Sequence, residues 1–169
     1  ELLKAKFLFN ENISANISIK TKNNFSNKFF NFGNFIFNID NGKINFNQST
    51  LINNKIGSLK LSNSNLLVQN DDLKFIGNFK FDIKDSDNFY SFILTPKKFR
   101  KPIKNITIRV EYDFIDNKLS INAFQIDGKE QVKINKDLFN NLHNLKDERL
   151  KNYIQYRNLF NKLLSVYEG

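Results

Sequence analysis

The sequence contains no cysteine, methionine or tryptophan, and its single histidine is His143. Without cysteine there are no disulfides, no thiolate catalysis and no cysteine-based zinc sites. A serine or threonine nucleophile needs a base beside its hydroxyl, and His143 lies among asparagine and leucine residues, where a solvated or capping role fits better. The carboxylates fall mostly in turns, where they accept hydrogen bonds from backbone amides. We therefore expect no catalytic residue, metal ligand or cofactor, and predict that the chain is not an enzyme.

Long apolar runs are also missing. No stretch approaches the roughly 20 apolar residues that a membrane-spanning helix requires. The chain of 169 residues is long enough to bury one core. Because it starts at Glu1 and has no methionine, we expect it to be a piece of a longer protein, with any signal or membrane anchor before Glu1.

Basic residues outnumber acidic ones by 26 to 17, which gives a formal net charge of +9. Such an excess is typical of proteins that bind nucleic acids or anionic lipids. The abundance of lysine, asparagine, phenylalanine and isoleucine is also what an AT-rich genome encodes in any protein, so the charge alone decides little. Nucleic-acid binding requires aromatic and basic side chains on one exposed surface, whereas here they fall on opposite faces of the same segments. We expect no nucleic acid partner.

What the sequence does contain is a regular alternation of apolar and polar residues. From Lys74 to Lys84 the odd positions hold Phe75, Gly77, Phe79, Phe81 and Ile83, and the even positions are mostly lysine, asparagine and aspartate. Successive side chains of a β-strand point to opposite faces, so this segment predicts a strand with one apolar face. Similar rows are Ile13, Ala15, Ile17, Ile19; Phe35, Phe37, Ile39; Ile44, Phe46; Leu59, Leu61; and Ile106, Ile108, Val110.

Short turns separate these rows. The pair Asn41-Gly42 predicts a type I′ hairpin turn, because both residues tolerate a positive φ. Turns this short join antiparallel neighbours, so a meander is expected. The apolar phase slips by one residue at Ala123-Phe124, which predicts a β-bulge. The expected strands are residues 2–9, 12–21, 28–40, 43–50, 57–62, 65–69, 73–84, 89–95, 104–115 and 118–127.

After Gly128 the apolar residues recur at steps of three and four, which indicates helices. Asn135 or Asp137 would cap a short helix and Asp147 a longer one. The predicted fold is mainly β: a long twisted antiparallel meander over residues 1–130, forming an open β-groove and capped by C-terminal α-helices over residues 131–169.

The apolar face of such a sheet has to be covered. Burying one phenylalanine removes roughly 150–250 Å² from water, worth about 2–3 kcal/mol. A second sheet, the C-terminal helices or a hydrocarbon ligand could supply the cover. At about 1.5 Å per residue, helices within residues 131–169 reach only one end of a sheet this long. We therefore expect part of the face to curl on itself or to hold a ligand.

Several segments together resemble the C-terminal region of the AsmA-like envelope proteins, the group that includes AsmA, YhdP and TamB. They are Gly42-Lys43-Ile44-Asn45-Phe46, Leu59-Lys60-Leu61, Phe75-Ile76-Gly77-Asn78-Phe79-Lys80-Phe81-Asp82-Ile83, Lys97-Lys98-Phe99-Arg100-Lys101 and the ending Tyr156-Arg157-Asn158-Leu159-Phe160 to Tyr167-Glu168-Gly169. The resemblance implies a repeating β-groove with a hydrophobic trough. It also implies a periplasmic location, an inner-membrane anchor upstream of this chain, and a part in moving phospholipids toward the outer membrane or in maintaining that membrane.

The expected function is therefore a non-enzymatic lipid-groove module. Candidate contacts for acyl chains are Phe35, Phe37, Phe46, Phe75, Phe79, Phe81, Ile83, Ile106, Ile108 and Val110. Candidate contacts for anionic headgroups are Lys97, Lys98, Arg100, Lys101 and Lys104, which a solvated turn would explain equally well. An alternative function is a β-domain that docks an outer-membrane assembly protein through its C-terminal helices. A third is a surface or phage-like β-structural protein, which would form a stable oligomer.

Overall fold

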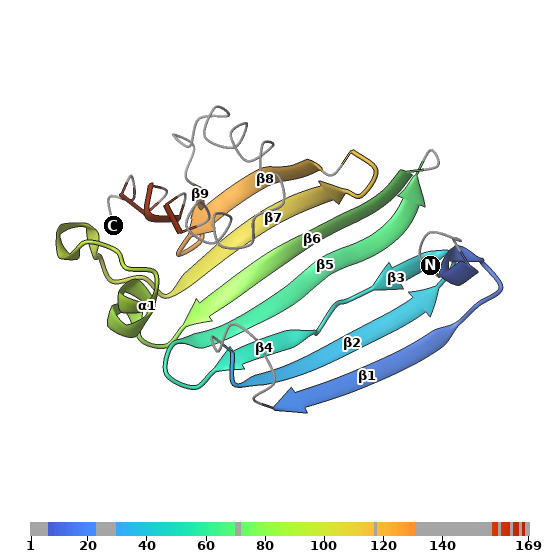
Figure 1. The fold of residues 1–169 in the computed structure, drawn as a ribbon, viewed down its shortest axis with the longest axis horizontal. Coiled ribbons are helices and arrows are strands. Elements are labelled where there is room, and N and C mark those ends of the chain that lie inside the picture. Colours follow the sequence, from blue (N-terminus) through green and yellow to red (C-terminus); the bar gives the residue numbers. More distant parts are fainter. Residues whose placement is uncertain are drawn as a thin grey trace.

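The computed structural model describes residues 7–22, 30–69, 72–116, 118–130, 157–158, 160–162, 164–165 and 167. They form mainly one antiparallel sheet, with α1 and the C-terminal helical residues near one end and η1 near the other (Figure 1). The strands are β1 (Ala15–Lys22), β2 (Phe32–Asp40), β3 (Lys43–Asn45), β4 (Thr50–Asn53), β5 (Gly57–Gln69), β6 (Asp72–Ile83), β7 (Asn105–Asp113), β8 (Lys118–Ile126) and β9 (Lys129–Glu130). The helices are η1 (Phe7–Phe9), α1 (Ser86–Phe92) and η2 (Lys97–Phe99), and residues 157–158, 160–162 and 164–165 are also helical.

The strands follow one another across the sheet in the order β1-β2-β3-β5-β6-β7-β8-β9. The short strand β4 also lies between β2 and β5 and pairs with both of them. All pairs are antiparallel, as expected for strands joined by short turns. The prediction of a mainly β antiparallel meander is confirmed.

The predicted hairpin turn joins β2 to β3. Asn41 and Gly42 have φ values of 47° and 68°, and the flanking residues Asp40 and Lys43 are paired. Two consecutive positive φ values define a type I′ turn, whose twist matches that of the flanking strands. This turn fixes the register of the hairpin, in which Ile39 pairs with Ile44 of β3.

The predicted bulge on β8 is also present. Arg109 pairs with Ala123, but the next residue of β7, Val110, pairs with Ile121. Asn122 is therefore the extra residue. It returns Phe124 to the apolar face, which a regular strand would not do.

A second bulge, in β5, was not predicted. The segments expected as two strands, 57–62 and 65–69, form one strand whose register shifts between Ser62 and Asn65. Asn63 takes a φ of 47°, and the buried Ser64 lies over Gly77. A Cβ at Gly77 would lie 2.9 Å from the Cβ of Ser64, so the glycine in the apolar row of β6 makes room for this bulge.

The predicted strand at residues 89–95 is wrong, because Ser86–Phe92 form helix α1. The carboxylate of Asp85 accepts a hydrogen bond from the Asn88 amide at 2.9 Å and so caps the helix. Phe89 and Tyr90, adjacent in sequence, are both buried, which a half-exposed strand would not allow. Residues 7–9 of the predicted strand 2–9 form the 3₁₀ helix η1 instead, and residues 1–6 lie outside the described residues.

The predicted strand 43–50 is shorter than expected, since β3 ends at Asn45. In the break before β4, the Ser49 hydroxyl accepts from the Ile36 amide at 2.9 Å and donates to the Ile36 carbonyl at 3.1 Å. The side chain thus satisfies both backbone groups of a β2 residue where the ladder is interrupted. The buried Ser49 keeps β3 and β4 in line.

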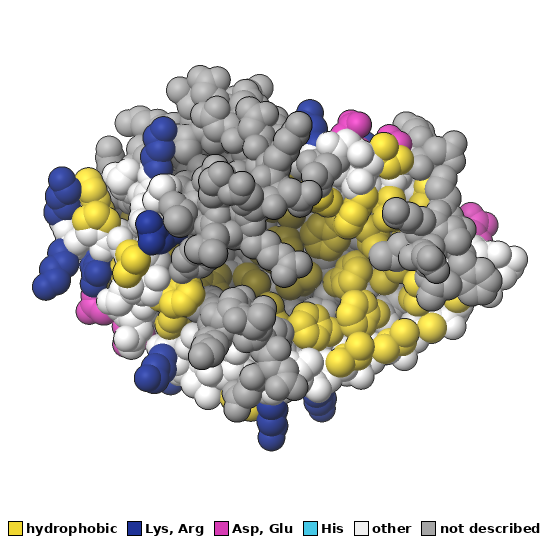
Figure 2. All heavy atoms as spheres, viewed as in Figure 1, with side chains coloured by type: hydrophobic (Ala, Val, Ile, Leu, Met, Phe, Trp, Pro, Cys, Tyr) yellow, Lys and Arg dark blue, Asp and Glu magenta, His cyan; other side chains and the backbone are white. Residues whose placement is uncertain are grey.

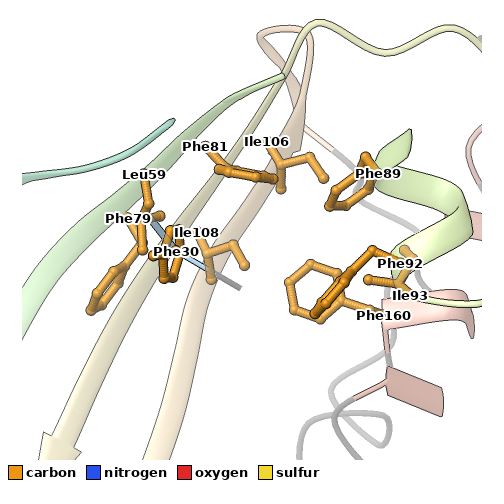
Figure 3. Close-up of a pocket in the computed structure, with 10 residues that line it drawn as sticks. All are labelled: Phe30, Leu59, Phe79, Phe81, Phe89, Phe92, Ile93, Ile106, Ile108 and Phe160. Atoms are coloured by element: carbon orange, nitrogen blue, oxygen red, sulfur yellow. The ribbon is translucent and has the colours of Figure 1, made fainter. Parts of the chain in front are cut away.

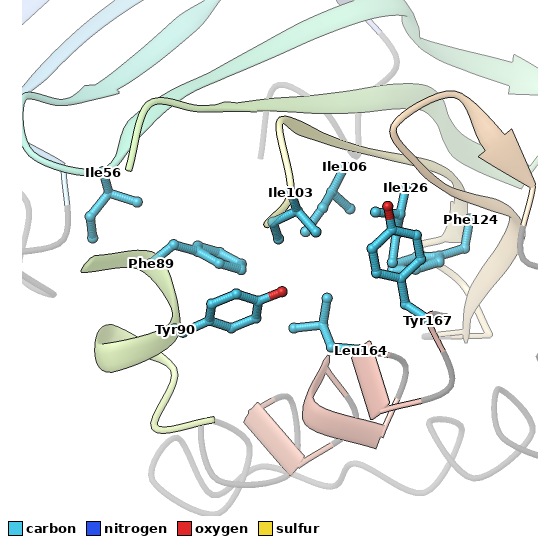
Figure 4. Close-up of a cluster of buried hydrophobic side chains, with 9 residues drawn as sticks. All are labelled: Ile56, Phe89, Tyr90, Ile103, Ile106, Phe124, Ile126, Leu164 and Tyr167. Carbon is cyan, nitrogen blue, oxygen red and sulfur yellow. The ribbon is translucent and has the colours of Figure 1, made fainter. Parts of the chain in front are cut away.

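Two clusters of buried side chains lie at the two ends of the apolar face. We call the first the α1 cluster; it contains Ile56, Phe89, Tyr90, Ile103, Ile106, Phe124, Ile126, Leu164 and Tyr167 (Figure 4). The second, the η1 cluster, contains Ile39, Ile44 and Leu66, with Leu8 and Phe9 packed against them. Leu164 and Tyr167 show that C-terminal residues cover one end of the sheet. The expected first helix, His143 and most of the proposed cap (131–156) lie outside the described residues.

Candidate functional site

The register of the sheet brings the predicted acyl-chain contacts onto one face. Cross-strand partners share a face, and Leu59, Phe81 and Ile106 form one such series across β5, β6 and β7. Another series pairs Phe79 with Ile108. The predicted residues Phe35, Phe37, Phe75, Phe79, Phe81, Ile83, Ile106, Ile108 and Val110 all have this orientation, and Phe46 follows β3 and contacts Phe37 and Phe75.

A row of phenylalanines crosses this face from β2 to β6. Ring centroids are 6.4 Å apart for Phe35 and Phe37, 5.3 Å for Phe37 and Phe46, 5.9 Å for Phe46 and Phe75, and 5.9 Å for Phe75 and Phe79. These separations lie in the favourable range for offset or edge-to-face aromatic pairs. We call these five side chains the phenylalanine row. It forms one continuous apolar track.

The phenylalanine row is only half-buried, whereas the clusters at both ends of the face are buried. The face continues to the edge strand β1, where Ile17 and Ile19 are 44% and 48% exposed. Figure 2 shows hydrophobic side chains gathered over the middle of this face, with lysine and arginine toward the periphery. The middle of the sheet therefore presents apolar surface between two closed ends.

A cavity of about 220 Å³ lies where the phenylalanine row meets α1. Its lining is entirely apolar and consists of Phe30, Leu59, Phe79, Phe81, Phe89, Phe92, Ile93, Ile106, Ile108 and Phe160 (Figure 3). The sheet supplies one wall, and α1 with Phe160 of the C-terminal helical residues supplies the other. Apolar cavities of about 150 Å³ stay dry and accept a benzene-sized hydrocarbon. This cavity is larger, so it has room for a piece of a hydrocarbon chain.

Four of the predicted contacts, Phe79, Phe81, Ile106 and Ile108, line the cavity, and Ile83 packs against the α1 cluster. The remaining predicted contacts lie on the same face outside the cavity. Sequence reasoning missed Phe30, Phe89, Phe92, Ile93 and Phe160, and it assigned Leu59 to an apolar row without a site role. The sequence feature that could have revealed α1 is Asp85. Aspartate is a preferred N-cap residue, and its carboxylate accepts a hydrogen bond from the backbone amide of Asn88, three residues later.

The predicted basic segment follows α1 and includes η2. Lys97, Lys98 and Lys104 are exposed, and the Lys98 ammonium lies 4.8 Å from the Phe99 ring centroid. Arg100 has a structural role as well, because its Nε donates to the Thr95 carbonyl at 2.9 Å. The backbone of Lys101 is bound to the Tyr90 hydroxyl, which donates to its carbonyl at 2.6 Å. The segment therefore offers exposed cations on a loop that α1 holds in place.

Hydrogen bonds join the C-terminal residues to this loop. The side-chain amide of Asn161 donates to the Ile93 carbonyl at 3.1 Å and accepts from the hydroxyl of the buried Thr95. Tyr167 donates to the Asp127 carboxylate at 3.2 Å. Burial, together with this carboxylate, raises the pKa of Tyr167. The two bonds of Asn161 hold the C-terminal residues against the end of α1, and the bond of Tyr167 holds them against the turn after β8.

The opposite face of the sheet is mainly polar. There Lys60 and Lys80 lie 3.0 and 3.3 Å from the carboxylate of Asp82. Partial burial alone would raise the pKa of Asp82, but the hydrogen bonds and positive charges of the two lysines lower it below its usual value. The contrast between the faces leaves the apolar one as the candidate site.

Among the residues that the structure describes, no group of histidine, cysteine, aspartate or glutamate side chains is arranged to hold a metal ion. In the same part of the chain, no helix combines the length and apolar character needed to cross a bilayer. No protein-family model, curated protein or solved structure gives a significant match to this chain.

Proposed function

We propose that this protein is a non-enzymatic module that binds the acyl chains of phospholipids along the apolar face of its sheet. The observation that carries the proposal is the continuity between the half-buried phenylalanine row and the wholly apolar cavity, which share Phe79. An acyl chain whose head-proximal carbons fill the cavity would continue along the row toward its methyl end. Each Å² of hydrocarbon surface that these contacts remove from water favours binding by about 25 cal/mol.

The charge distribution supports the same orientation of a lipid. Exposed lysines lie on the loop that follows α1, next to the cavity wall. Each cation near an anionic lipid surface contributes about 1 kcal/mol. A lipid with its chain on the phenylalanine row and its headgroup in water could therefore place the headgroup near Lys97 and Lys98.

The resemblance to AsmA-like envelope proteins extends the proposal to the cell. In that setting the module would act in the periplasm as part of a longer, inner-membrane-anchored protein. It would contribute to phospholipid transport toward the outer membrane or to the maintenance of that membrane.

The alternative function, docking of an outer-membrane assembly protein through the C-terminal helices, has less support. Phe160, Leu164 and Tyr167 are turned toward the sheet of the same chain, whereas a docking helix needs a free apolar stripe. The described C-terminal residues that face away from this core are mainly polar.

Extraction and mass spectrometry of lipids that co-purify with the protein test the proposal. We expect phospholipids to be retained through affinity and size-exclusion steps without detergent. A protein that carries no lipid, and that takes up none from phospholipid vesicles, would rule out the lipid-binding function.

A further inference from the structure

A second hollow, of about 430 Å³, lies between the C-terminal helical residues and the segment that follows α1, residues 93–99, which we call the α1 loop. We call it the basic groove; it is lined by Leu94, Pro96, Phe99, Arg157, Asn158, Asn161, Lys162 and Ser165. Its lining, all of it within the described residues, includes two cationic side chains and no carboxylate. The groove is therefore positive and has polar donors.

The C-terminal residues of the groove come from one side of a helical segment. Arg157, Asn161 and Ser165 recur every fourth residue, and Asn158 and Lys162 lie beside them. Residues at this spacing share a helix face. Phe160 and Leu164 belong to the other side, which packs on the sheet. The segment thus separates an apolar core from a polar, basic surface.

The opposite wall of the groove is formed by η2 and the loop between α1 and η2. Leu94 is 62% exposed and, although not a glycine, has a positive φ of 55°. Phe99 lies on the same wall, with the Lys98 ammonium 4.8 Å from its ring centroid. An apolar wall facing a basic wall suits a ligand with both apolar and anionic parts.

The basic groove and the apolar cavity are immediate neighbours along the chain. Ile93 and Phe160 line the cavity, and the residues that follow them, Leu94 and Asn161, line the groove. The hydrogen bond from Asn161 to the Ile93 carbonyl lies at this partition. One amphiphilic molecule could therefore occupy the cavity with its chain and reach the groove with its head.

We propose that the basic groove binds the phosphate group of a phospholipid, with Arg157 and Lys162 as its anionic-group contacts. This inference rests on the proposed function, because it assigns the acyl chain of the same lipid to the apolar face. A guanidinium presents its N–H groups in a fork that matches phosphate oxygens, and an ammonium adds a compact charge. Asn158 and Ser165 add neutral hydrogen-bonding groups to the same wall. The earlier candidates Lys97 and Lys98 lie just outside the groove lining and contribute to its positive field.

The test compares two soluble probes below their micellar concentrations by isothermal titration calorimetry: dihexanoylphosphatidic acid and dihexanoylglycerol, which lacks the phosphate. The double variant Arg157→Gln, Lys162→Gln is compared with Lys20→Gln, Lys22→Gln, which removes the same charge from the exposed strand β1. We expect the wild type to prefer the phosphatidic acid by at least about tenfold, since hydrogen bonds to charged groups are strong. The groove variant should lose this preference, and the β1 variant should keep it.

The outcomes separate the groove from the apolar face. If the wild type binds both probes equally, or if both double variants lose the preference to the same extent, the phosphate site is excluded while acyl-chain binding stands. Binding of neither probe contradicts both proposals. Glycerol 3-phosphate, which has the phosphate but no acyl chain, is titrated as a third probe. If it binds as tightly as the phosphatidic acid, the groove is a site for free phosphate compounds and the lipid assignment is wrong. Circular dichroism melting of each variant checks that the fold is retained.

Discussion

The side-chain amide of Asn161 donates a hydrogen bond of 3.1 Å to the backbone carbonyl of Ile93, which joins the C-terminal helical residues to the end of α1. The same side chain accepts from the hydroxyl of Thr95, which is 1% exposed. The two bonds hold the partition between the apolar cavity and the basic groove. One side-chain amide therefore links residues that line the two hollows.

Replacing Asn161 by alanine should destabilise the protein. The change leaves the buried Thr95 hydroxyl and the Ile93 carbonyl without this partner, and an unsatisfied buried polar group costs about 1–3 kcal/mol. Urea unfolding measures the loss. The control is Asn158→Ala, an exposed position on the same segment, and equal losses in the two variants would contradict the structural role of Asn161.

Filling the apolar cavity should reduce lipid binding without unfolding the protein. Ile108→Phe places a larger side chain into a space of about 220 Å³. Because free volume is available, we expect little of the usual cost of overpacking, which is about 1–3 kcal/mol. Phospholipid recovered with the variant should fall severalfold, measured by mass spectrometry against protein concentration.

The matched control for that variant is Val68→Phe. Val68 lies on the same face of β5 but toward the end opposite α1, outside the cavity lining. It should leave the amount of bound lipid close to that of the wild type. If Ile108→Phe retains as much lipid as Val68→Phe, the acyl chain does not occupy the cavity.

Alanine substitutions at two glycines test whether η1 packs against the hairpin turn. Gly42 and Gly128 have φ values of 68° and 76°, so alanine at either position adopts a left-handed conformation that costs about 1–2 kcal/mol. At Gly42 the new Cβ would also lie 2.9 Å from the Phe9 carbonyl oxygen, whereas at Gly128 it meets nothing within 4 Å. Thermal unfolding should show that Gly42→Ala is the more destabilising change, by about 1 kcal/mol or more. Equal effects would mean that η1 does not pack against the turn.

The stability of the polar face should decrease in acid. The pKa of Asp82 is lower in the folded protein than its usual value, so the contribution of this carboxylate is complete above that value and is lost as the pH falls through the folded pKa. The carboxylate is 35% exposed, so its ion pairs are screened and the contribution is small. In NMR titrations, Lys60→Gln should raise the pKa of Asp82 and Lys43→Gln should not. No change with Lys60→Gln would contradict the assigned cause.

Much of the sheet follows from the sequence because its causes are local. The alternation at residues 75–83 sets the face of β6, and Asn41-Gly42 sets a turn whose positive φ values few other residue pairs tolerate. The phase slip near Ala123 predicts the bulge, because a buried face allows no residue to point the wrong way.

The site was predicted only in part because half of it comes from elements with ambiguous local signals. Phe89 and Phe92 lie in a seven-residue helix, too short for its period to stand out from an alternating strand. The cavity also depends on Phe160, which follows β8 by more than thirty residues and whose position is set by tertiary hydrogen bonds such as that of Asn161. The basic groove was not predicted for the same reason. The sequence around Arg157 and Lys162 does not indicate that these residues face the α1 loop.

The location of a bound hydrocarbon chain can be measured by NMR with 5-doxylstearate, a fatty acid that carries a spin label near its carboxylate end. Ile108 and Ile76 serve as the two reporters, because they lie on adjacent strands and on opposite faces of the sheet. The carboxylate-proximal part of the chain is predicted to occupy the cavity, so the methyl signals of Ile108 should broaden more strongly than those of Ile76. Equal broadening on both faces, or none on either, would contradict binding of acyl chains by the apolar face.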